Sequence, residues 1–219
     1  RRSRESTLLS TSLRSYFRLF AVFFSKMALV ALPAAETEPP RVDAILPRLL
    51  LANAAFANDR ARLKGHLVRA LLSVTPTPHP HAAVVQRTVA MMQVCVDDAK
   101  TSNLYDHLDG CVEFIERSMA AGNVVCVHCH QGVSRSVAVV VAFLIWRLHM
   151  TLRDALSFVL DHRSIESPPS HPNSGFLMQL VRWEKRHLAR DDPSLEFLEY
   201  TREAHRAWSG RNRGPCAKD

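Results

Sequence analysis

The stretch VVCVHCHQGVSRSVAVVVAFLIWRL, residues 124–148, decides the fold of this chain. Its opening, VVCVH at 124–128, is almost wholly apolar and predicts a short buried strand. Its end, Val137 to Leu148, is apolar around nearly its whole circumference and predicts a helix buried in the middle of a domain. A polar loop at 129–134 joins the two. A strand that runs through a loop into a buried helix is typical of an α/β fold.

Predicted strands and helices alternate on both sides of this stretch. The predicted strands lie around Ile45 and Leu49–Leu51, at Leu67–Val74 and at Val89–Val96, while PTPHPH at 76–81 must be loop. Helices are predicted at 58–65, after an Asn58 or Asp59 cap, and at 104–119, 152–162, 173–187 and 194–208. This order predicts an α/β sandwich with a largely parallel sheet. Since ligands bind such sheets at the carboxyl ends of strands, the site is expected near residue 129.

Composition is that of a globular protein with anionic partners. Hydrophobic residues make up 47% and charged residues 22% of the 219 residues, which excludes a disordered or collagen-like chain. The net charge of +7 favours anionic partners without choosing among nucleic acid, lipid and phosphoprotein. Five cysteines leave one unpaired in any disulfide scheme, which favours a reducing compartment.

The loop between strand and helix has the residues of an anion cradle. Cys129 and Arg135 bracket it, so successive backbone N–H groups can point inward around a tetrahedral anion, aided by the positive end of the helix. Gly132 permits a backbone approach that a side chain would block. The planar guanidinium of Arg135 can hold two oxygens at once. A phosphate fits these requirements.

The same field favours the thiolate form of Cys129, which makes this residue a candidate nucleophile toward phosphorus. The leaving oxygen then needs a proton, and the acidic pair Asp97 and Asp98 ends the preceding predicted strand. Ser136 can hydrogen-bond the sulfur and ease its departure when water cleaves the intermediate. This chemistry requires neither a metal nor a cofactor.

Cys126 and Cys129 also form a CxxC pair. With the period of two of a strand, Cys126 and His128 share one face, so Cys126 is predicted to be a buried core residue. A regulatory disulfide between the two cysteines is the alternative.

HCHQGVSRS at 128–136 fits the HCxxGxxR signature and closely resembles the dual-specificity branch of the cysteine-based protein tyrosine phosphatases. The resemblance extends over roughly residues 42–188. RLLLANAAFAND looks like the opening strand and first helix of that branch, and DDAKTSNL like its acid loop. HPNSGFLMQLVRWE is similar to its PNxGFxxQLxxxE helix. The resemblance implies a single domain with a central, mostly parallel, five-stranded sheet flanked by helices.

The resemblance also implies roles for individual residues. Cys129 is then the nucleophile, Asp98 the general acid with Asp97 in reserve, and His128 a residue that orders the loop, while Asn173 braces it. The implied catalytic set is Cys129, Arg135, Asp98, Ser136 and His128, and the implied substrate-binding set is His130, Gln131, Gly132, Val133, Ser134 and Arg135. A shallow pocket open to phosphotyrosine, phosphoserine and phosphothreonine follows.

This chain departs from the family pattern at several places. Ala52 stands where the family usually has glycine, and extra residues lie between Arg163 and Pro172, near the expected pocket rim. The loop carries no lysine and no second arginine, unlike the relatives that act on inositol phospholipids, which disfavours a lipid substrate.

We expect a basic amphipathic extension and proline-rich linker at 1–40, a catalytic domain at 41–188, and a helix and tail at 189–219. Three interpretations of residues 1–26 stay open: a mitochondrial transit or membrane-surface segment, with contact through residues 8–24; sequence upstream of a true start at Met27; or a secretory signal. No stretch is long and apolar enough for a membrane span.

Two function classes follow. The first is a phosphatase acting on phosphorylated proteins, with kinases among the candidates and no nucleic-acid partner. The second is a phosphate-binding scaffold of the same fold with negligible turnover. The presence of nucleophile, clamp and acid favours the enzyme. The cytoplasm is the expected location, or the mitochondrion if residues 1–26 are a transit peptide.

Overall fold

The computed structural model describes residues 39–79, 88–163 and 171–188. The strands are β1 (Val42–Leu46), β2 (Leu49–Ala52), β3 (Val68–Val74), β4 (Ala90–Val94) and β5 (Val124–His128). The helices are α2 (Ala54–Ala57), α3 (Arg60–Gly65), α5 (Tyr105–Ala120), α6 (Arg135–Leu148), α7 (Leu152–Asp161) and α8 (Ser174–Leu188). The expectations for residues 1–38 and for a helix at 194–208 lie outside the described residues.

The strands form one five-stranded sheet in the order β1-β2-β5-β3-β4. Only the β1–β2 pair is antiparallel; β2, β5, β3 and β4 run parallel. β5 lies in the centre, where Val127 pairs with Leu51 of β2 on one side and with Leu72 of β3 on the other. The predicted mostly parallel sheet is confirmed. Because β3, β4 and β5 are parallel, the segments that follow them leave the same edge.

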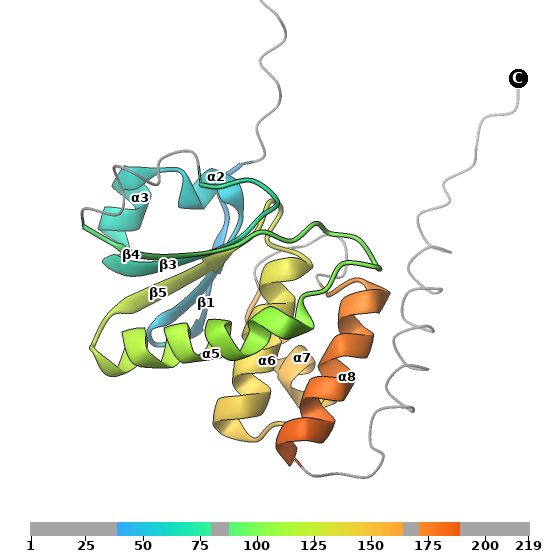
Figure 1. Ribbon diagram of the computed structural model, residues 1–219. Coiled ribbons are helices and arrows are strands. Elements are labelled where there is room, and N and C mark those ends of the chain that lie inside the picture. Colours follow the sequence, from blue (N-terminus) through green and yellow to red (C-terminus); the bar gives the residue numbers. More distant parts are fainter. Residues whose placement is uncertain (1–38, 80–87, 164–170, 189–219) are drawn as a thin grey trace, which may run out of the picture. The chain divides into compact units, whose positions relative to one another are not determined.

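Helices cover both faces of this sheet (Figure 1), with α2 and α3 on one face and α5, α6, α7 and α8 on the other. The central strand alternates between the two cores. Val125 and Val127 pack in the larger core, and Cys126 packs with Phe56 and Leu63 in the smaller one. This period-two alternation is what a strand covered on both faces requires.

Helix α6 lies inside the larger core. Every residue from Val137 to Ile145 is buried, because the helix is packed between the sheet and the neighbouring helices α5, α7 and α8. This explains a helix that is apolar all round. The helix begins at Arg135, so Arg135 and Ser136 lie in its first turn, directly after the loop.

The structure decides between the two cap residues that the sequence offered for α3 and adds a helix, α2, that the periodicity of the sequence did not predict. Asp59 caps α3, and its Oδ1 accepts the N–H groups of Ala61 and Arg62. Asn58 instead ends α2. This helix is one turn long and has no periodic pattern of its own in the sequence. It begins after Asn53, whose Oδ1 accepts the Phe56 N–H at 3.1 Å. Within the described ranges, none of the helices combines the length and apolarity needed to cross a bilayer.

Candidate active site

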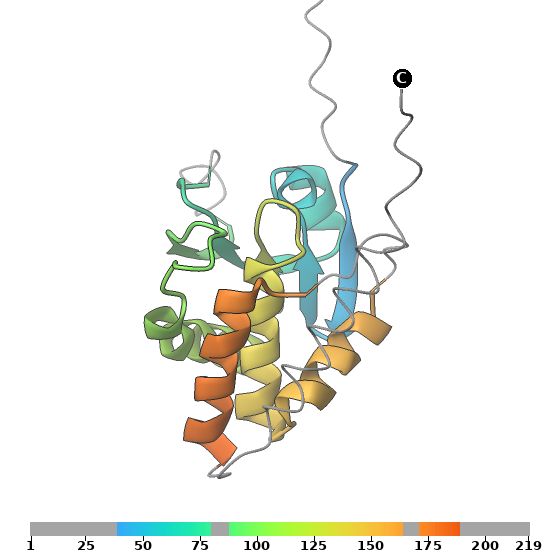
Figure 2. The same ribbon diagram turned by 90° about the vertical axis from the view of Figure 1, so that its right-hand side faces the viewer.

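The loop at 129–134 follows β5 at the carboxyl edge of the sheet. Figure 2 shows it above α6, near the start of α8. Gly132 has φ +72°, and an added Cβ would lie 2.7 Å from the Ala52 carbonyl oxygen. A side chain is therefore excluded both by conformation and by space. The His130 carbonyl accepts the Ala54 N–H at 2.9 Å, which ties the loop to the end of β2.

The Cys129 sulfur lies between two hydrogen-bond donors. The Gly132 N–H and the Ser136 hydroxyl each donate to Sγ at 3.2 Å. Cys129 is only 1% exposed, so its sulfur forms the floor of the loop rather than the rim. Each of these two donors can form a charge-assisted hydrogen bond when the sulfur carries negative charge.

Arg135 is buried at the other end of the loop. Its Nη1 donates to the Val96 carbonyl at 3.2 Å, and its Nε lies 3.6 Å from Asp98 Oδ2. The side chain is 8% exposed. Val96 and Asp98, which follow β4, thus fix the Arg135 guanidinium at the end of the loop where the sequence predicts a phosphate site.

The structure brings Asp98, rather than Asp97, to the loop. Asp98 Oδ1 accepts the Ser134 hydroxyl at 2.7 Å and the Asn173 Nδ2 at 2.8 Å. Asp97 is exposed and takes no part in these contacts. The Ser134 oxygen also accepts the Asn173 N–H at 3.1 Å, so Asn173 braces both the acid and the loop.

Helix α8 holds the acid loop in place at two points. Asn173 Oδ1 caps the helix by accepting the N–H groups of Gly175 and Phe176 at 3.0 and 3.1 Å. An added Cβ at Gly175 would overlap the Lys100 carbonyl, so the helix and the acid loop are in close backbone contact. One turn further on, Gln179 reaches the same segment.

Gln179 is a residue whose role the sequence did not predict. Its Oε1 accepts the N–H groups of Leu104 and Tyr105 at 2.8 and 2.7 Å, and its Nε2 donates to the Ser102 carbonyl at 2.8 Å. These contacts cap α5 and complete the bracing of residues 98–104. The glutamine was visible in the motif at 171–184, but only its three-dimensional partners reveal what it does.

His128 lies beneath the loop and supports it. Its Nε2 shares a 2.7 Å hydrogen bond with Ser73 Oγ, and its Nδ1 lies 3.2 Å from the Cys129 carbonyl. Burial lowers the pKa of His128 to about 4, so the imidazole is neutral at neutral pH. The His79 ring lies edge-on at 5.7 Å. The expected ordering role fits these contacts, because His128 touches backbone and core rather than solvent.

His130 and Gln131 are exposed at the rim of the loop, and Val133 is partly exposed. A pocket of about 350 Å³ opens beside them. It is lined by Ala54, Asn58, Thr75, Pro76, Thr77, Pro78, His79, His128, His130 and Arg135. The segment after β3 therefore forms one wall of this pocket, and His130 and Arg135 place it beside the loop.

Arg163, at the end of α7, is a second residue whose role was not predicted. Its Nη1 donates to the Gly132 carbonyl at 2.7 Å, and its Nε lies 3.6 Å from Asp43 Oδ2. Burial lowers the pKa of this guanidinium, whereas the negative charges of Asp43 and Cys129 raise it. The one signal in the sequence was a lone acid, Asp43, within the otherwise apolar VDAIL.

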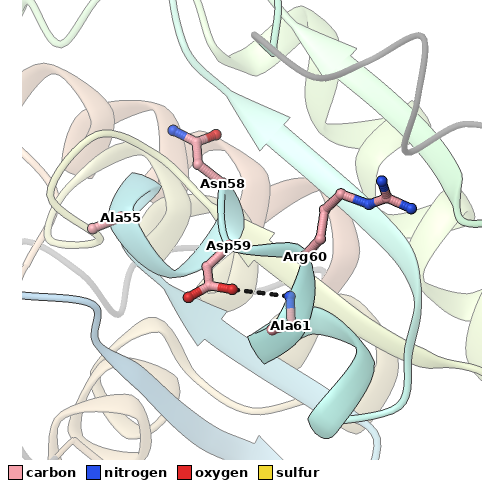
Figure 3. A pocket seen from close by; sticks show the side chains of 5 residues that line it. All are labelled: Ala55, Asn58, Asp59, Arg60 and Ala61. Atoms are coloured by element: carbon pink, nitrogen blue, oxygen red, sulfur yellow. Dashed lines mark hydrogen bonds between the residues drawn. The ribbon is translucent and has the colours of Figure 1, made fainter.

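A separate, open pocket of about 540 Å³ lies at the α2–α3 corner (Figure 3). Ala55, Asn58, Asp59, Arg60 and Ala61 line it. The Asp59 carboxylate in this pocket caps α3, since Asp59 Oδ1 accepts the Ala61 N–H at 2.9 Å. No residue of the 129–135 loop lines this pocket, so we place the chemistry at the loop.

Comparison with known proteins agrees with this geometry. A family model described as "Dual specificity phosphatase, catalytic domain" matches residues 49–186. Dual specificity protein phosphatase Mpk3 of Drosophila melanogaster is 34% identical over 143 residues, which is 65% of this chain and 34% of that protein. Dual specificity protein phosphatase 22-B of Danio rerio is 30% identical over 165 residues, which is 75% of this chain and 82% of that protein.

Solved structures give the same picture. The crystal structure of human DUSP28 superposes with a TM-score of 0.60 at 30% sequence identity, covering 68% of this chain and 95% of that one. The curated relatives differ in length, and the match to Mpk3 spans about a third of that protein, 34%. The family model covers β2 to β5, the loop and α5 to α7 with most of α8 in one continuous segment, and β1 precedes the matched residues.

Proposed function

Because the chain belongs to the dual-specificity phosphatase family, we propose that it hydrolyses phosphotyrosine and phosphoserine or phosphothreonine esters of proteins through a cysteinyl-phosphate intermediate. The observation that carries this proposal is the Cys129 sulfur, held between the Gly132 N–H and the Ser136 hydroxyl at the start of a loop that Arg135 closes. A nucleophile activated in this way needs a phosphoryl group in front of it and a proton donor beside it.

In the first half of the reaction the Cys129 thiolate attacks phosphorus. The S–P bond forms, the P–O bond to the substrate breaks, and Asp98 gives its proton to the leaving oxygen. The loop amides and the Arg135 guanidinium stabilise the charge on the phosphoryl oxygens. The position of Asp98, hydrogen-bonded to Ser134 of the loop itself, supports its role as the acid.

In the second half, water attacks phosphorus and the S–P bond breaks. The Asp98 carboxylate accepts the proton of the water, and the product is inorganic phosphate. The Ser136 hydroxyl, which donates to Sγ at 3.2 Å, stabilises the departing thiolate. The enzyme returns to its starting state without a metal or an organic cofactor taking part.

The test is hydrolysis of p-nitrophenyl phosphate and of phosphopeptides by the purified chain. We expect turnover that vanadate inhibits and that Cys129→Ser abolishes, and the serine variant should still bind phosphopeptides. Cys126→Ser is the matched control, since Cys126 packs in the opposite core and should leave turnover unchanged. Hydrolysis that survives Cys129→Ser would refute the mechanism.

One observation favours a second candidate, the phosphate-binding scaffold. Asp98 is engaged at once by Ser134, Asn173 and Arg135, so its carboxylate is committed to bracing the loop. If these contacts persist with substrate bound, the leaving group receives no proton and the pocket binds without turnover. Wild-type protein that binds phosphopeptide but releases no phosphate would favour the scaffold.

Partners and location are proposals from the sequence. Phosphorylated kinases are proposed substrates, and residues 8–24 are proposed to contact anionic membrane surfaces. We propose the cytoplasm as the location, with the mitochondrion as the alternative if residues 1–26 act as a transit peptide. A pull-down with Cys129→Ser from cytosolic and mitochondrial fractions tests partner and compartment together, and import of the full chain into isolated mitochondria would favour the alternative.

A further inference from the structure

Arg163 lies between the anion loop and strand β1 and contacts both. We propose that the Asp43–Arg163 pair positions the loop for phosphate, by holding the Gly132 carbonyl on the outer side so that the next amide faces the anion. The inference rests on the proposed function and adds to it a positioning residue from the segment directly after α7, outside the loop.

The direction of the Gly132 carbonyl fixes the direction of the amide that follows it. In a trans peptide the C=O and the following N–H lie in one plane and point in opposite directions. Arg163 Nη1 donates to the Gly132 carbonyl oxygen at 2.7 Å, which fixes the direction of that C=O. The Val133 N–H must then point to the opposite side. The Gly132 N–H points at the Cys129 sulfur, 3.2 Å away, so the two neighbouring peptide units are oriented by different partners.

The peptide unit that follows Gly132 needs a restraint on its rotation. Gly132 has φ +72° and no side chain to limit its rotation, so the peptide unit that follows it can turn over more easily than at other residues. A turned peptide would present a carbonyl oxygen to the phosphate in place of an N–H donor. A hydrogen bond from a buried cation to the carbonyl opposes this, because charge-assisted hydrogen bonds are the strong ones.

Asp43 pairs with the buried guanidinium of Arg163. The side chains of Arg163 and Asp43 are 4% and 3% exposed, and a buried charge is costly unless it is paired. Asp43 pairs in the β1–β2 ladder with Leu51, next to Ala52, whose carbonyl packs against Gly132. The β1–β2 hairpin thus supports Gly132 twice, directly through the Ala52 backbone and indirectly through Asp43 and Arg163.

Charged groups of both signs surround Arg163. The groups that interact electrostatically with Arg163 are Asp43 and Cys129, which are acidic, and Arg41, which is basic. The cation of Arg163 therefore attracts both the Asp43 carboxylate and a Cys129 thiolate. The Asp43 carboxylate holds the guanidinium in place from its Nε side, at 3.6 Å, while Nη1 donates to the Gly132 carbonyl of the loop.

The experiment compares the wild type with Arg163→Met, Arg163→Lys and the control Arg147→Met. Arg147 is an exposed arginine paired with Glu116 at the far end of α6, so its loss removes a charge without touching the loop. Each variant is assayed for kcat, KM and vanadate inhibition, and for protection of Cys129 from iodoacetamide by vanadate. Near-ultraviolet circular dichroism and the melting temperature report folding.

For Arg163→Met we expect vanadate to bind at least about tenfold more weakly and kcat to fall by a similar factor, since one amide donor is lost from the transition-state site. Arg163→Lys keeps the positive charge but lacks the planar guanidinium that reaches both the Gly132 carbonyl and the Asp43 carboxylate. Its vanadate binding and kcat should therefore lie between those of Arg163→Met and the wild type. Arg147→Met should match the wild type.

The inference is overturned if folded Arg163→Met keeps the vanadate constant and kcat of the wild type, even with a lower melting temperature, since that result indicates a purely structural pair. If the methionine variant does not fold, Arg163→Lys decides: vanadate binding equal to that of the wild type overturns the inference, and weaker binding by the folded protein supports it. A wild type that neither binds vanadate nor hydrolyses phosphate esters overturns the proposed function as well, which distinguishes the two failures.

Discussion

Hydrogen-bond partners at the scale of single residues separate the two acids that end the strand before the loop. Asp98 accepts from Ser134 and Asn173, whereas Asp97 is exposed outside this network. Asp98→Asn keeps an acceptor oxygen for both donors, and it removes the transferable proton together with the negative charge that faces Arg135 Nε at 3.6 Å. The variant therefore tests acid catalysis without dismantling the loop.

We expect Asp98→Asn to reduce kcat on a phosphoserine peptide by about 10² to 10³-fold, and to affect p-nitrophenyl phosphate much less, because nitrophenolate leaves without protonation. Steady-state kinetics on both substrates measure the difference. Asp97→Asn is the control and should resemble the wild type. Equal losses on the two substrates, or a larger loss for Asp97→Asn, would move the acid elsewhere.

His128 predicts how stability depends on pH. Its folded-state pKa is about 4, against an ordinary value of 6.5, because burial disfavours the imidazolium. Between these values the unfolded chain binds a proton that the folded protein does not, so stability falls as the pH is lowered from about 6.5 to 4. The expected loss from this residue is about 3 kcal/mol.

Urea unfolding at a series of pH values from 7 to about 4 measures this loss. His128→Gln keeps a polar partner for Ser73 and removes the titration, so its stability should vary less over the same range. An equally steep fall in the variant would assign the pH dependence to other groups.

At the scale of elements, α8 holds the start of α5 and the acid loop through one side chain. Gln179 makes hydrogen bonds to Ser102, Leu104 and Tyr105. Gln179→Leu leaves the N–H groups of Leu104 and Tyr105 without this acceptor, and each unpaired buried group costs about 1–3 kcal/mol.

We therefore expect Gln179→Leu to lower the free energy of unfolding by about 2–4 kcal/mol, and to lower kcat because Asp98 precedes the loosened segment. Urea denaturation and phosphatase kinetics measure the two effects. Lys185→Ala, at an exposed position on the same helix, is the control and should change neither. A stable variant with wild-type kcat would show that Asn173 alone braces the acid.

At the scale of the whole molecule, the sheet separates the two cysteines of the CxxC pair. Cys126 packs in the core beneath α2 and α3, and Cys129 in the core beneath α5 to α8. Burial also raises the pKa of Cys126 to about 12, which keeps its thiol protonated. The two sulfurs lie on opposite faces of a paired central strand.

Peroxide treatment should therefore inactivate the protein at Cys129 without forming a Cys126–Cys129 disulfide. Peptide mapping by mass spectrometry after oxidation detects such a bridge directly. Cys126→Ser should be inactivated at the same rate as the wild type. A Cys126–Cys129 disulfide in the folded protein would mean that β5 leaves the sheet during oxidation.

Topology at this scale also explains how distant segments form one site. The parallel strands β3, β4 and β5 end at the same edge, so the segments after them carry His79, Asp98 and Cys129 to that edge, where Asp98 pairs with Arg135 and His79 lines a pocket with it. The sequence order alone spreads these residues over three separate loops.

The sequence by itself determined the α/β class, the buried helix α6 and the Cys129–Arg135 loop, because these follow from short-range periodicity and from contacts within a few residues. It narrowed the acid to Asp97 or Asp98 by position along the chain. Only the tertiary structure placed Gln179 against residues 75 positions away and Arg163 against Gly132, 31 positions away. Such contacts depend on how helices pack on the sheet, and no local pattern of residues encodes which polar groups that packing leaves facing each other.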